Sequence, residues 1–201
     1  MTENNILGVV LAGGKSRRFG SDKSSVKLGD KSLIEHTISK IENNFKEILI
    51  ITNNENIIFN NNNVFLINDI IKGYLGPLVG VLTAMDWVKK NKKNYNWIAT
   101  FPCDTPFFDQ SVIETIIKYP QKSTKKLFFL KSGNKRRNIF GLWSMELKDI
   151  LLKDINNGYR KVEEWANKVG SEIIEINSKN DNNFLNINTK EDLEKAKKKI
   201  K

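Results

Sequence analysis

The sequence predicts an α/β fold, a three-layer sandwich around a mostly parallel, mixed sheet of about seven strands. Apolar runs of strand length alternate with longer segments of helical period along the chain, which is typical of strands joined by helical crossovers. In addition, 39% of the 201 residues are hydrophobic, enough for one substantial core. The expected strands are residues 6–12, 47–52, 64–68, 97–101, 126–131, 138–143 and 171–176.

Helices are expected between these strands, and two of them begin with a recognisable signal. Ser32 and Glu35 form a capping box before the pattern "LIEHTISKI", and Thr189 with Asp192 repeats the device before the last helix. Because no internal repeat and no Pro/Ser-rich linker interrupts the pattern, residues 1–201 are expected to form one domain. The other expected helices are 77–89, 110–118, 145–155 and 159–168.

The composition limits the ligands and the location. No run approaches the ~20 apolar residues that span a bilayer, and no basic region followed by an apolar one opens the chain, so we expect a cytoplasmic protein without a membrane partner. One cysteine, Cys103, and one histidine exclude an internal disulfide and a Cys/His zinc site, so any metal is expected on oxygen ligands. The net charge of +10 favours an anionic partner, which could be a nucleotide, nucleic acid or anionic lipid. No interleaved basic-aromatic motif supports a nucleic acid, so no nucleic-acid partner is expected.

Polar residues directly follow several of the expected strands. In a mostly parallel sheet, ligands bind at the carboxyl ends of the strands, near the switch in strand order. Residues 13–23 follow the first strand, Asn53 follows the second, and "PCDTP" follows the fourth. We therefore expect one ligand site at that edge of the sheet.

The loop after the first strand, "LAGGKSRRFGSDK", is cationic and glycine-rich. It does not match a P-loop, because five residues rather than four separate Gly8 from the Gly-Lys-Ser. Gly13 and Gly14 let backbone N–H groups approach a ligand closely, and four cations within nine residues favour a triphosphate. The alternative is a glycine turn followed by a basic surface loop. The four cations are Lys15, Arg17, Arg18 and Lys23.

Two carboxylates occupy equivalent places after strands. Asp104 lies just beyond an apolar strand, between Pro102 and Pro106, which restrict the backbone. Asp69 follows another strand in the same way. A stiffly held carboxylate suits Mg²⁺, which takes one or two carboxylates together with substrate phosphates. The alternative for Asp104 is a cap on the helix expected to begin near Gln110.

Two further stretches fit the same site. "GPLVG", residues 76–80, opens a helix whose N–H groups can meet an anion. In "FLNINT", Asn186 and Asn188 alternate along an extended segment, so both side chains are expected on one side, where amides can bind a ligand or a metal-bound water. Turn-forming asparagine is the alternative in so Asn-rich a chain.

These motifs together resemble a known family. The first loop is similar to the signature loop of the molybdenum cofactor guanylyltransferases, within the nucleotide-sugar-pyrophosphorylase-like nucleotidyltransferases. The resemblance extends along nearly the whole chain, through "GPLVG", "PCDTP", "NNGYRKVEEW" and "FLNINTKEDL". It implies a Rossmann-like, nucleotide-diphospho-sugar transferase-like fold. It also implies transfer of GMP from GTP to the phosphate of molybdopterin (Mo-molybdopterin), which releases pyrophosphate and forms molybdopterin guanine dinucleotide.

The resemblance further implies Mg²⁺ as the cofactor, GTP and molybdopterin as substrates, and other molybdenum cofactor biosynthesis proteins and acceptor molybdoenzymes as partners. The implied nucleotide-binding residues are Leu11, Ala12, Gly13, Gly14, Lys23, Asn53, Asp69 and Asp104. The implied catalytic residues are Arg18, Lys23 and Asp104, of which Asp104 also holds the metal. The implied contacts to the pterin or the metal are Gly80, Arg160, Lys161, Asn186 and Asn188.

The chain departs from the family pattern at two places. Phe19 stands where the family usually has Met, and Arg137-Asn138 stands where many members have His-Pro before an apolar strand. The extra cation suits an anionic pterin phosphate. Gly13 and "GPLVG" favour guanine, because cytidylyltransferase relatives typically have Ala and a serine-containing stretch there. The alternatives are a nucleotidyltransferase that uses CTP or a sugar-phosphate acceptor, and a basic nucleic-acid-binding or nucleotide-sensing module without turnover.

Overall fold

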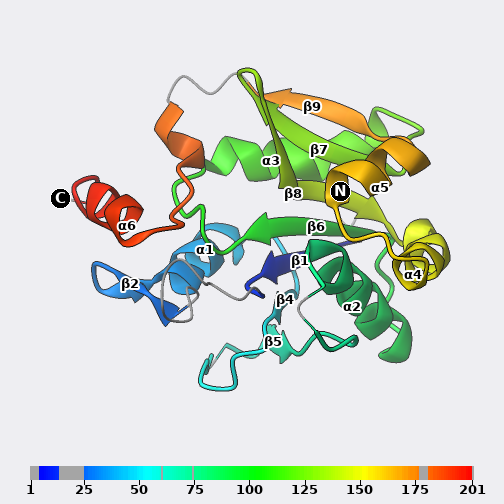
Figure 1. Cartoon of the computed structure of the whole chain (residues 1–201), viewed down its shortest axis with the longest axis horizontal. Helices are drawn as coiled ribbons and strands as arrows, with labels where there is room; N and C mark the ends of the chain where they lie inside the picture. The colour runs from blue at the N-terminus through cyan, green and yellow to red at the C-terminus, as the bar shows by residue number, and fades with distance from the viewer. Residues whose placement is uncertain (1–4, 14–24, 60, 74, 177–180, 201) are drawn as a thin grey trace.

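The computed structural model describes residues 5–13, 25–59, 61–73, 75–176 and 181–200. Its centre is a seven-stranded sheet with the order β5-β4-β1-β6-β8-β7-β9 (Figure 1). Strand β8 is antiparallel to both of its neighbours, β6 and β7, and the other neighbouring pairs are parallel. The predicted mixed, mostly parallel sheet is confirmed. The strands are β1 (Ile6–Leu11), β4 (Ile48–Ile51), β5 (Val64–Ile67), β6 (Trp97–Pro102), β7 (Leu127–Ser132), β8 (Lys135–Ser144) and β9 (Glu172–Ile176).

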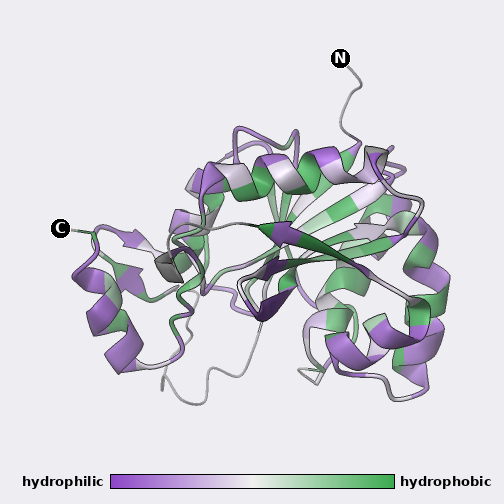
Figure 2. Ribbon diagram, turned by 90° about the horizontal axis from the view of Figure 1, so that it is seen from above, coloured by the Kyte–Doolittle hydropathy of each residue, from purple (hydrophilic) through white to green (hydrophobic). Residues whose placement is uncertain are grey.

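Helices cover both faces of this sheet, and their apolar sides turn toward it (Figure 2). Alternation along β1 shows why both faces need cover: Ile6 and Val10 lie in one hydrophobic core, and Leu7 and Val9 lie in another. Helices α1 (Leu33–Ile41) and α3 (Gln110–Lys118) pack on the first core. Helices α2 (Pro77–Lys90), α4 (Lys148–Asn156) and α5 (Val162–Val169) pack on the second.

Both predicted capping boxes are present. The Ser32 hydroxyl accepts from the Glu35 N–H, and the Glu35 carboxylate accepts from the Ser32 N–H at the start of α1. Thr189 and Asp192 do the same at the start of α6 (Lys190–Lys197). Each box satisfies backbone donors that a helix leaves without partners in its first turn, so these starts follow from local sequence.

Some short elements were not predicted. They are the antiparallel hairpin β2 (Lys27–Leu28) and β3 (Lys31–Ser32), and the 3₁₀ turns η2 (Tyr119–Gln121) and η4 (Asp181–Phe184). The 3₁₀ turn η3 (Met145–Leu147) lies at the start of the expected helix 145–155. The hairpin packs with α6 in a small third core of Leu28, Leu33, Ile187, Leu193 and Ala196. This core joins the C-terminal part of the chain to the region after β1. Within the described residues, no helix is long and apolar enough to cross a membrane.

Three element starts differ from the prediction by three residues. Helix α4 begins at Lys148 rather than at residue 145, because residues Met145–Leu147 form the 3₁₀ turn η3. Strand β8 begins at Lys135, three residues earlier than expected. Helix α5 begins at Val162 rather than at residue 159, because Lys161 is an extended N-cap and the Tyr159 N–H closes the end of α4 on the Asp154 carbonyl, 3.0 Å away. The residues in between therefore form a connection rather than a helical turn.

Candidate active site

Four parallel strands end together at one edge of the sheet. Leu11, at the end of β1, pairs in register with Ile51 of β4 and Pro102 of β6, and Ile51 pairs with Ile67 of β5. The residues that follow these ends must therefore share one edge, as the sequence predicted. They include Gly13, Asn53, Asp69 and Asp104.

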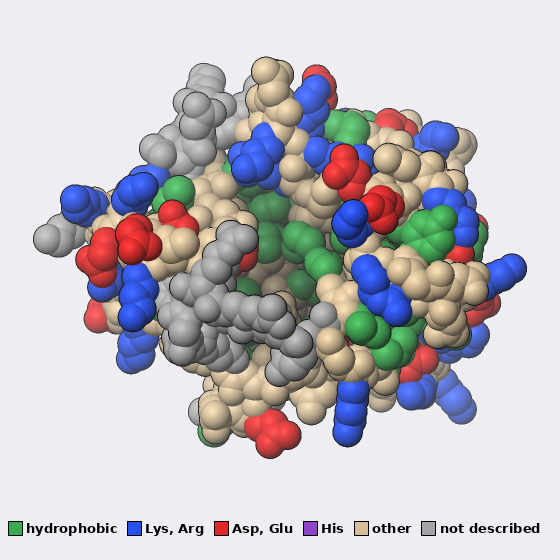
Figure 3. Space-filling view, in the orientation of Figure 1, with side chains coloured by type: hydrophobic (Ala, Val, Ile, Leu, Met, Phe, Trp, Pro, Cys, Tyr) green, Lys and Arg blue, Asp and Glu red, His purple; other side chains and the backbone are tan. Residues whose placement is uncertain are grey.

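A cleft of about 970 Å³ opens at this edge. Figure 3 shows the face hollowed near its centre, with hydrophobic side chains on the floor and Lys and Arg side chains at the upper rim. We define two sides of this cleft, separated by Pro102, Asp104 and Thr105 at the end of β6. The β1 side consists of Leu11, Gly13, Ile51, Asp69, Gly76, Pro77 and Gly80, and the β8 side of residues 135–140, Phe184, Leu185, Asn186, Asn188 and Asp192.

On the β1 side, helix α2 comes unusually close to the strands at Gly80. A Cβ on Gly80 would lie 2.8 Å from Leu11 Cδ2 and 3.9 Å from Asp69 Oδ1, and real Cβ atoms do not approach a neighbour as closely as the first distance. At the helix start, Gly76 adopts a φ of +91° that side chains disfavour, and Pro77 occupies the first turn. The glycines of "GPLVG" thus let α2 close this wall of the cleft.

Asp69 and Asn53 hold each other on the same side. The Asn53 amide donates to Asp69 Oδ2 at 2.9 Å, and the Asp69 N–H donates to Asn53 Oδ1 at 3.2 Å. Burial raises the pKa of the Asp69 carboxyl above its ordinary value, while the hydrogen bond from Asn53 acts in the opposite direction. A Cβ on Gly13 would lie 3.7 Å from Asp69 Oδ2, so the carboxylate sits beside the backbone that leaves β1.

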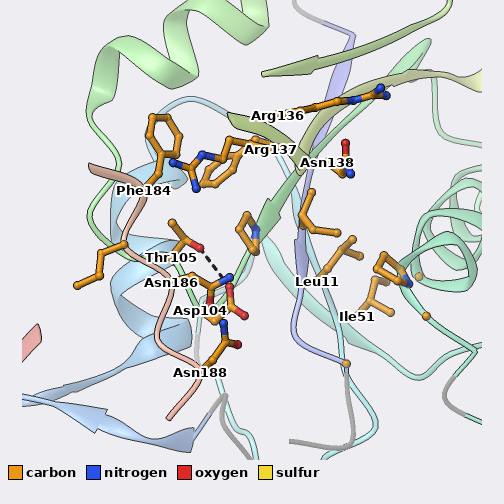
Figure 4. Close-up of a pocket in the computed structure, with 18 of the residues that line it drawn as sticks. Leu11, Ile51, Asp104, Thr105, Arg136, Arg137, Asn138, Phe184, Asn186 and Asn188 are labelled. Atoms are coloured by element: carbon orange, nitrogen blue, oxygen red, sulfur yellow. Dashed lines mark hydrogen bonds between the residues drawn. The ribbon is translucent and has the colours of Figure 1, made fainter. Parts of the chain in front are cut away.

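Asp104 lies between the two sides. Its Oδ1 accepts a hydrogen bond from the buried Thr105 hydroxyl at 3.1 Å (Figure 4). The alternative role of Asp104 as a helix cap is wrong, because the N-cap of α3 is Asp109. Asp104 is only partly buried, and it lines the cleft.

The C-terminal segment brings Asn186 and Asn188 to Asp104. Between them, Ile187 is fully buried in the third core, and its N–H donates to the Asp104 carbonyl at 2.8 Å. Because side chains alternate along an extended segment, the two asparagines face the other way. Both line the cleft near Asp104 (Figure 4), as their spacing predicted.

Of the residues at the start of β8, only Arg137-Asn138 was related to the site, as a departure from the family pattern whose cation suits a pterin phosphate. Residues 135–140 reach the cleft because β8 is antiparallel, so this strand begins where its neighbour β6 ends. Thr105, Phe184 and Asp192 also line the cleft without having been predicted there. A further available signal was Gly133-Asn134, a two-residue turn typical of an antiparallel hairpin.

Arg160 and Lys161 are not among the residues that line this cleft. The Arg160 guanidinium donates to the carbonyls of Ile155 and Tyr159, at 2.6 and 2.7 Å, and so closes the C-terminal end of α4. The exposed Lys161 ammonium pairs with Glu164 at 2.6 Å. The Arg160 carbonyl nevertheless approaches the cleft, because a Cβ on Gly76 would lie 3.2 Å from it.

The remaining predicted site residues are not among the described residues that line the cleft. Ala12 is buried behind the cleft, and its N–H donates to the Ile51 carbonyl at 2.9 Å. Gly14, Arg18 and Lys23 lie outside the described residues. In the described part of the chain, no three His, Cys, Asp or Glu side chains gather as a metal site, so a metal in this cleft would depend on few protein carboxylates.

An α/β sheet whose strand ends present glycines, acids and amides to a cleft has the architecture of a nucleotide-binding enzyme. The sequence model described as MobA-like NTP transferase domain matches residues 8–169. The chain therefore belongs to the MobA-like NTP transferase family, and the family resemblance expected from the motifs is confirmed.

Individual relatives agree with this family. The chain is 32% identical, over 92% of its length and 92% of the relative's, to a protein named molybdenum cofactor guanylyltransferase from Shewanella woodyi. It is also 32% identical to a protein of the same name from Haemophilus influenzae, over 95% of this chain and 97% of that one.

Solved structures agree with the fold. The structure titled molybdopterin-guanine dinucleotide biosynthesis protein A from Archaeoglobus fulgidus has a TM-score of 0.80 and 23% identity, and covers 96% of this chain and 98% of that one. A 2-C-methyl-D-erythritol 4-phosphate cytidylyltransferase from Francisella tularensis has a TM-score of 0.69 at 17% identity, over 96% of this chain and 98% of that one. The nucleotide-diphospho-sugar transferase-like fold is thus confirmed.

Proposed function

We propose that this protein transfers GMP from GTP to the phosphate of molybdopterin, releases pyrophosphate and forms molybdopterin guanine dinucleotide. The names of the relatives at 32% identity support this reaction. The observation that carries it is the placement of Asp104 between two differently built sides of one cleft. A group transfer between two anionic substrates requires such an arrangement, because both must reach one reacting phosphorus.

The β1 side is the proposed GTP site. Leu11, Ala12 and Gly13 form the proposed backbone edge beside the guanine and ribose, and the Asn53–Asp69 pair offers fixed hydrogen-bonding groups next to it. Gly14 is assigned to the same site from the family resemblance. A buried, pre-oriented pair discriminates between bases, because the wrong base leaves its polar atoms without partners. Arg18 and Lys23 are proposed, from the family resemblance, to neutralise the triphosphate.

The donors around Asp104 fit Mg²⁺. One carboxylate and the nearby side chains of Asn186 and Asn188 are oxygen-bearing groups, which are the ligands that this hard cation takes while leaving positions to water and substrate phosphates. We propose that Asp104 holds the metal and that the asparagines contact the metal's water or the pterin. When bound, Mg²⁺ supplies positive charge to the triphosphate.

The chain's own contribution is alignment and charge. The acceptor is a phosphate monoester that is already ionised near neutral pH, so one of its oxygens can bond to the α-phosphorus of GTP while the bond to the bridging oxygen breaks and pyrophosphate leaves. No proton has to be removed, so no general base is needed. The residues named above orient the two substrates for in-line displacement and stabilise the charge on the leaving group.

The roles of Gly80, Arg160 and Lys161 as pterin contacts stay predictions from the resemblance. Gly80 lies on the β1 side, which supports a role in shaping the GTP site. We further propose that residues 1–201 act as one nucleotidyltransferase domain, and that other molybdenum cofactor biosynthesis proteins and acceptor molybdoenzymes exchange the substrate and product with it.

The direct test is to incubate the purified protein with Mg²⁺, molybdopterin and labelled GTP, and to look for labelled dinucleotide and released pyrophosphate. Parallel reactions with CTP, ATP and UTP test the base choice, and a sugar phosphate in place of molybdopterin tests the acceptor. We expect product only with GTP and molybdopterin. Equal product with CTP, or product only with a sugar phosphate, would contradict the proposal.

A further inference from the structure

Strand β8 carries a bulge where it meets the cleft. Phe129 of β7 pairs with Gly141, but the next residue, Leu130, pairs with Arg137, so the register jumps at this point. Residues 138–140 of β8 are therefore extra to the ladder. On the other side, the Thr100 hydroxyl of β6 donates to the Ile139 carbonyl at 2.7 Å and holds the bulged backbone.

The bulge lies next to the cleft, as bulges often do beside active sites, and all six residues 135–140 line the cleft. Residues 135–137 pair regularly with β7, so their side chains alternate between the two faces of the sheet. Lys135 and Arg137 therefore share one face, and Arg136 points to the other face, toward Phe129 of the second core.

Aromatic rings hold two of these cations in place. The Arg136 guanidinium lies 4.6 Å from the centroid of Phe129, and its Nη2 donates to the Ser171 hydroxyl at 3.2 Å. The Arg137 guanidinium lies 4.9 Å from the centroid of Phe184 (Figure 4). A guanidinium stacked on a ring is pre-oriented, so it loses less freedom when it binds a phosphate.

Asn138 adds a hydrogen-bond acceptor beside the cations. Its Oδ1 is inaccessible to solvent and has no hydrogen-bond partner among the described residues. A buried amide oxygen is costly when it accepts no hydrogen bond, so a ligand with an N–H group would satisfy it. The carboxylate on this side, Asp192, is already engaged by the N–H groups of Asn188 and Thr189, each at 3.0 Å.

We infer that the bulged segment 135–140 is the binding wall for the acceptor substrate: Arg137, with Lys135, binds an anionic phosphate monoester, and Asn138 Oδ1 accepts from an N–H of the planar heterocycle that carries it. This inference rests on the proposed function, because it specifies which part of the same cleft receives the acceptor. It separates the two anionic substrates in space, with the triphosphate on the β1 side and the monoester on the β8 side.

The test compares the affinities for the two substrates measured separately. Molybdopterin binding is titrated without nucleotide through the pterin fluorescence, and GTP binding is titrated with Mg²⁺ by calorimetry. We expect Arg137→Gln to weaken molybdopterin binding by about tenfold or more, because a charge-assisted hydrogen bond is lost, and to change GTP binding by less than about twofold. Arg137→Lys should lose part of this affinity, since it keeps the charge but not the bidentate geometry.

A second variant and a control distinguish the loss of a contact at residues 135–140 from a change in net charge or in folding. Asn138→Ala should weaken molybdopterin binding while leaving GTP binding and the melting temperature nearly unchanged. Lys126→Gln removes one charge from an exposed lysine that precedes β7, at the end of that strand away from the cleft, and should change neither affinity.

The other outcomes would contradict either the inference alone or the proposed function as well. If Arg137→Gln weakens GTP binding as much as molybdopterin binding, or leaves molybdopterin binding unchanged, the inference is wrong while the proposed function stands. If the wild-type protein binds GTP but not molybdopterin, the proposed function fails, and the inference fails with it.

Discussion

The β1 side and the β8 side of the cleft are built in different ways. On the β1 side, parallel strands end in register and position glycines and an Asn53–Asp69 pair through the backbone. On the β8 side, an antiparallel strand enters with a bulge and lines the cleft with residues that carry long side chains, such as Lys135 and Arg137. Backbone pairing within the sheet fixes the β1 side, whereas the β8 side depends on the side chains that line it. Variants on the β1 side should therefore affect folding and binding together, and variants on the β8 side should affect binding alone.

The largest effect is expected at Asp104, where the two sides meet. Asp104→Ala should lower turnover by on the order of 10²–10³-fold, the usual cost of losing one charge-stabilising group. It should change the free energy of unfolding by less than about 1 kcal/mol, because the carboxylate is only partly buried. Steady-state rates and urea unfolding measure the two quantities. Asp149→Ala, an exposed acid in the first turn of α4, is the control, and near-normal Mg²⁺-dependent activity of Asp104→Ala would refute the assignment.

The next effect tests how tightly the β1 side is built. Gly80→Ala places a Cβ 2.8 Å from Leu11 Cδ2. Because that atom is the movable end of a side chain and alanine favours a helix interior, we expect a loss of at most about 1 kcal/mol in the free energy of unfolding, together with weaker GTP binding as Leu11 shifts. The double variant Gly80→Ala/Leu11→Ala should recover part of this loss, because it removes the clashing atoms. Denaturant unfolding of the two single variants and the double variant gives the coupling, and strictly additive effects would mean that the close approach is unimportant.

Most of the fold and part of the site could be predicted from the sequence. All seven strands, the main helices and both capping boxes follow from local periodicity and local hydrogen bonds. The shared edge of Asn53, Asp69 and Asp104 follows from the parallel pattern, and the common side of Asn186 and Asn188 follows from alternation.

The β8 side could not be read in the same way. The two-residue turn Gly133-Asn134 is a local signal of an antiparallel hairpin between β7 and β8 that was not used. The bulge and the pairing of β8 with β6 carry no such local mark. Arg137 therefore looked like a departure from a family pattern rather than part of a wall. The same limit applies to Arg160: a sequence shows a cation, but only the structure shows that its guanidinium closes the end of α4.

A smaller, pH-dependent effect is expected at Asp69. Its raised pKa means that the folded chain holds the proton more tightly than the unfolded chain. The stability that this group contributes is therefore complete below its ordinary pKa of 3.8 and is lost as the pH rises through the raised value. Asp69→Asn carries no such charge, so its stability relative to wild type should increase across that interval and stay constant above it.

Thermal unfolding of wild type and Asp69→Asn, from about pH 3.5 to pH 7, measures this difference. Asn53→Ala provides a directional control, because it removes the hydrogen bond that lowers the pKa of Asp69 and should make the pH dependence of the otherwise wild-type protein steeper. A stability difference between wild type and Asp69→Asn that does not change with pH would contradict the burial of this carboxyl.

The smallest effect is expected at Lys161, which lies outside both sides of the cleft. Its exposed ammonium pairs with Glu164, and exposed ion pairs contribute little to stability. Lys161→Ala should therefore leave the melting temperature nearly unchanged and change molybdopterin affinity by less than about twofold. Substitution of the neighbouring Arg160 should change stability more. Arg160→Gln loses hydrogen bonds to the carbonyls of Ile155 and Tyr159 and should destabilise the chain by about 1 kcal/mol. Measured in parallel, a large loss of molybdopterin affinity in Lys161→Ala at unchanged stability would extend the acceptor site beyond the β8 side.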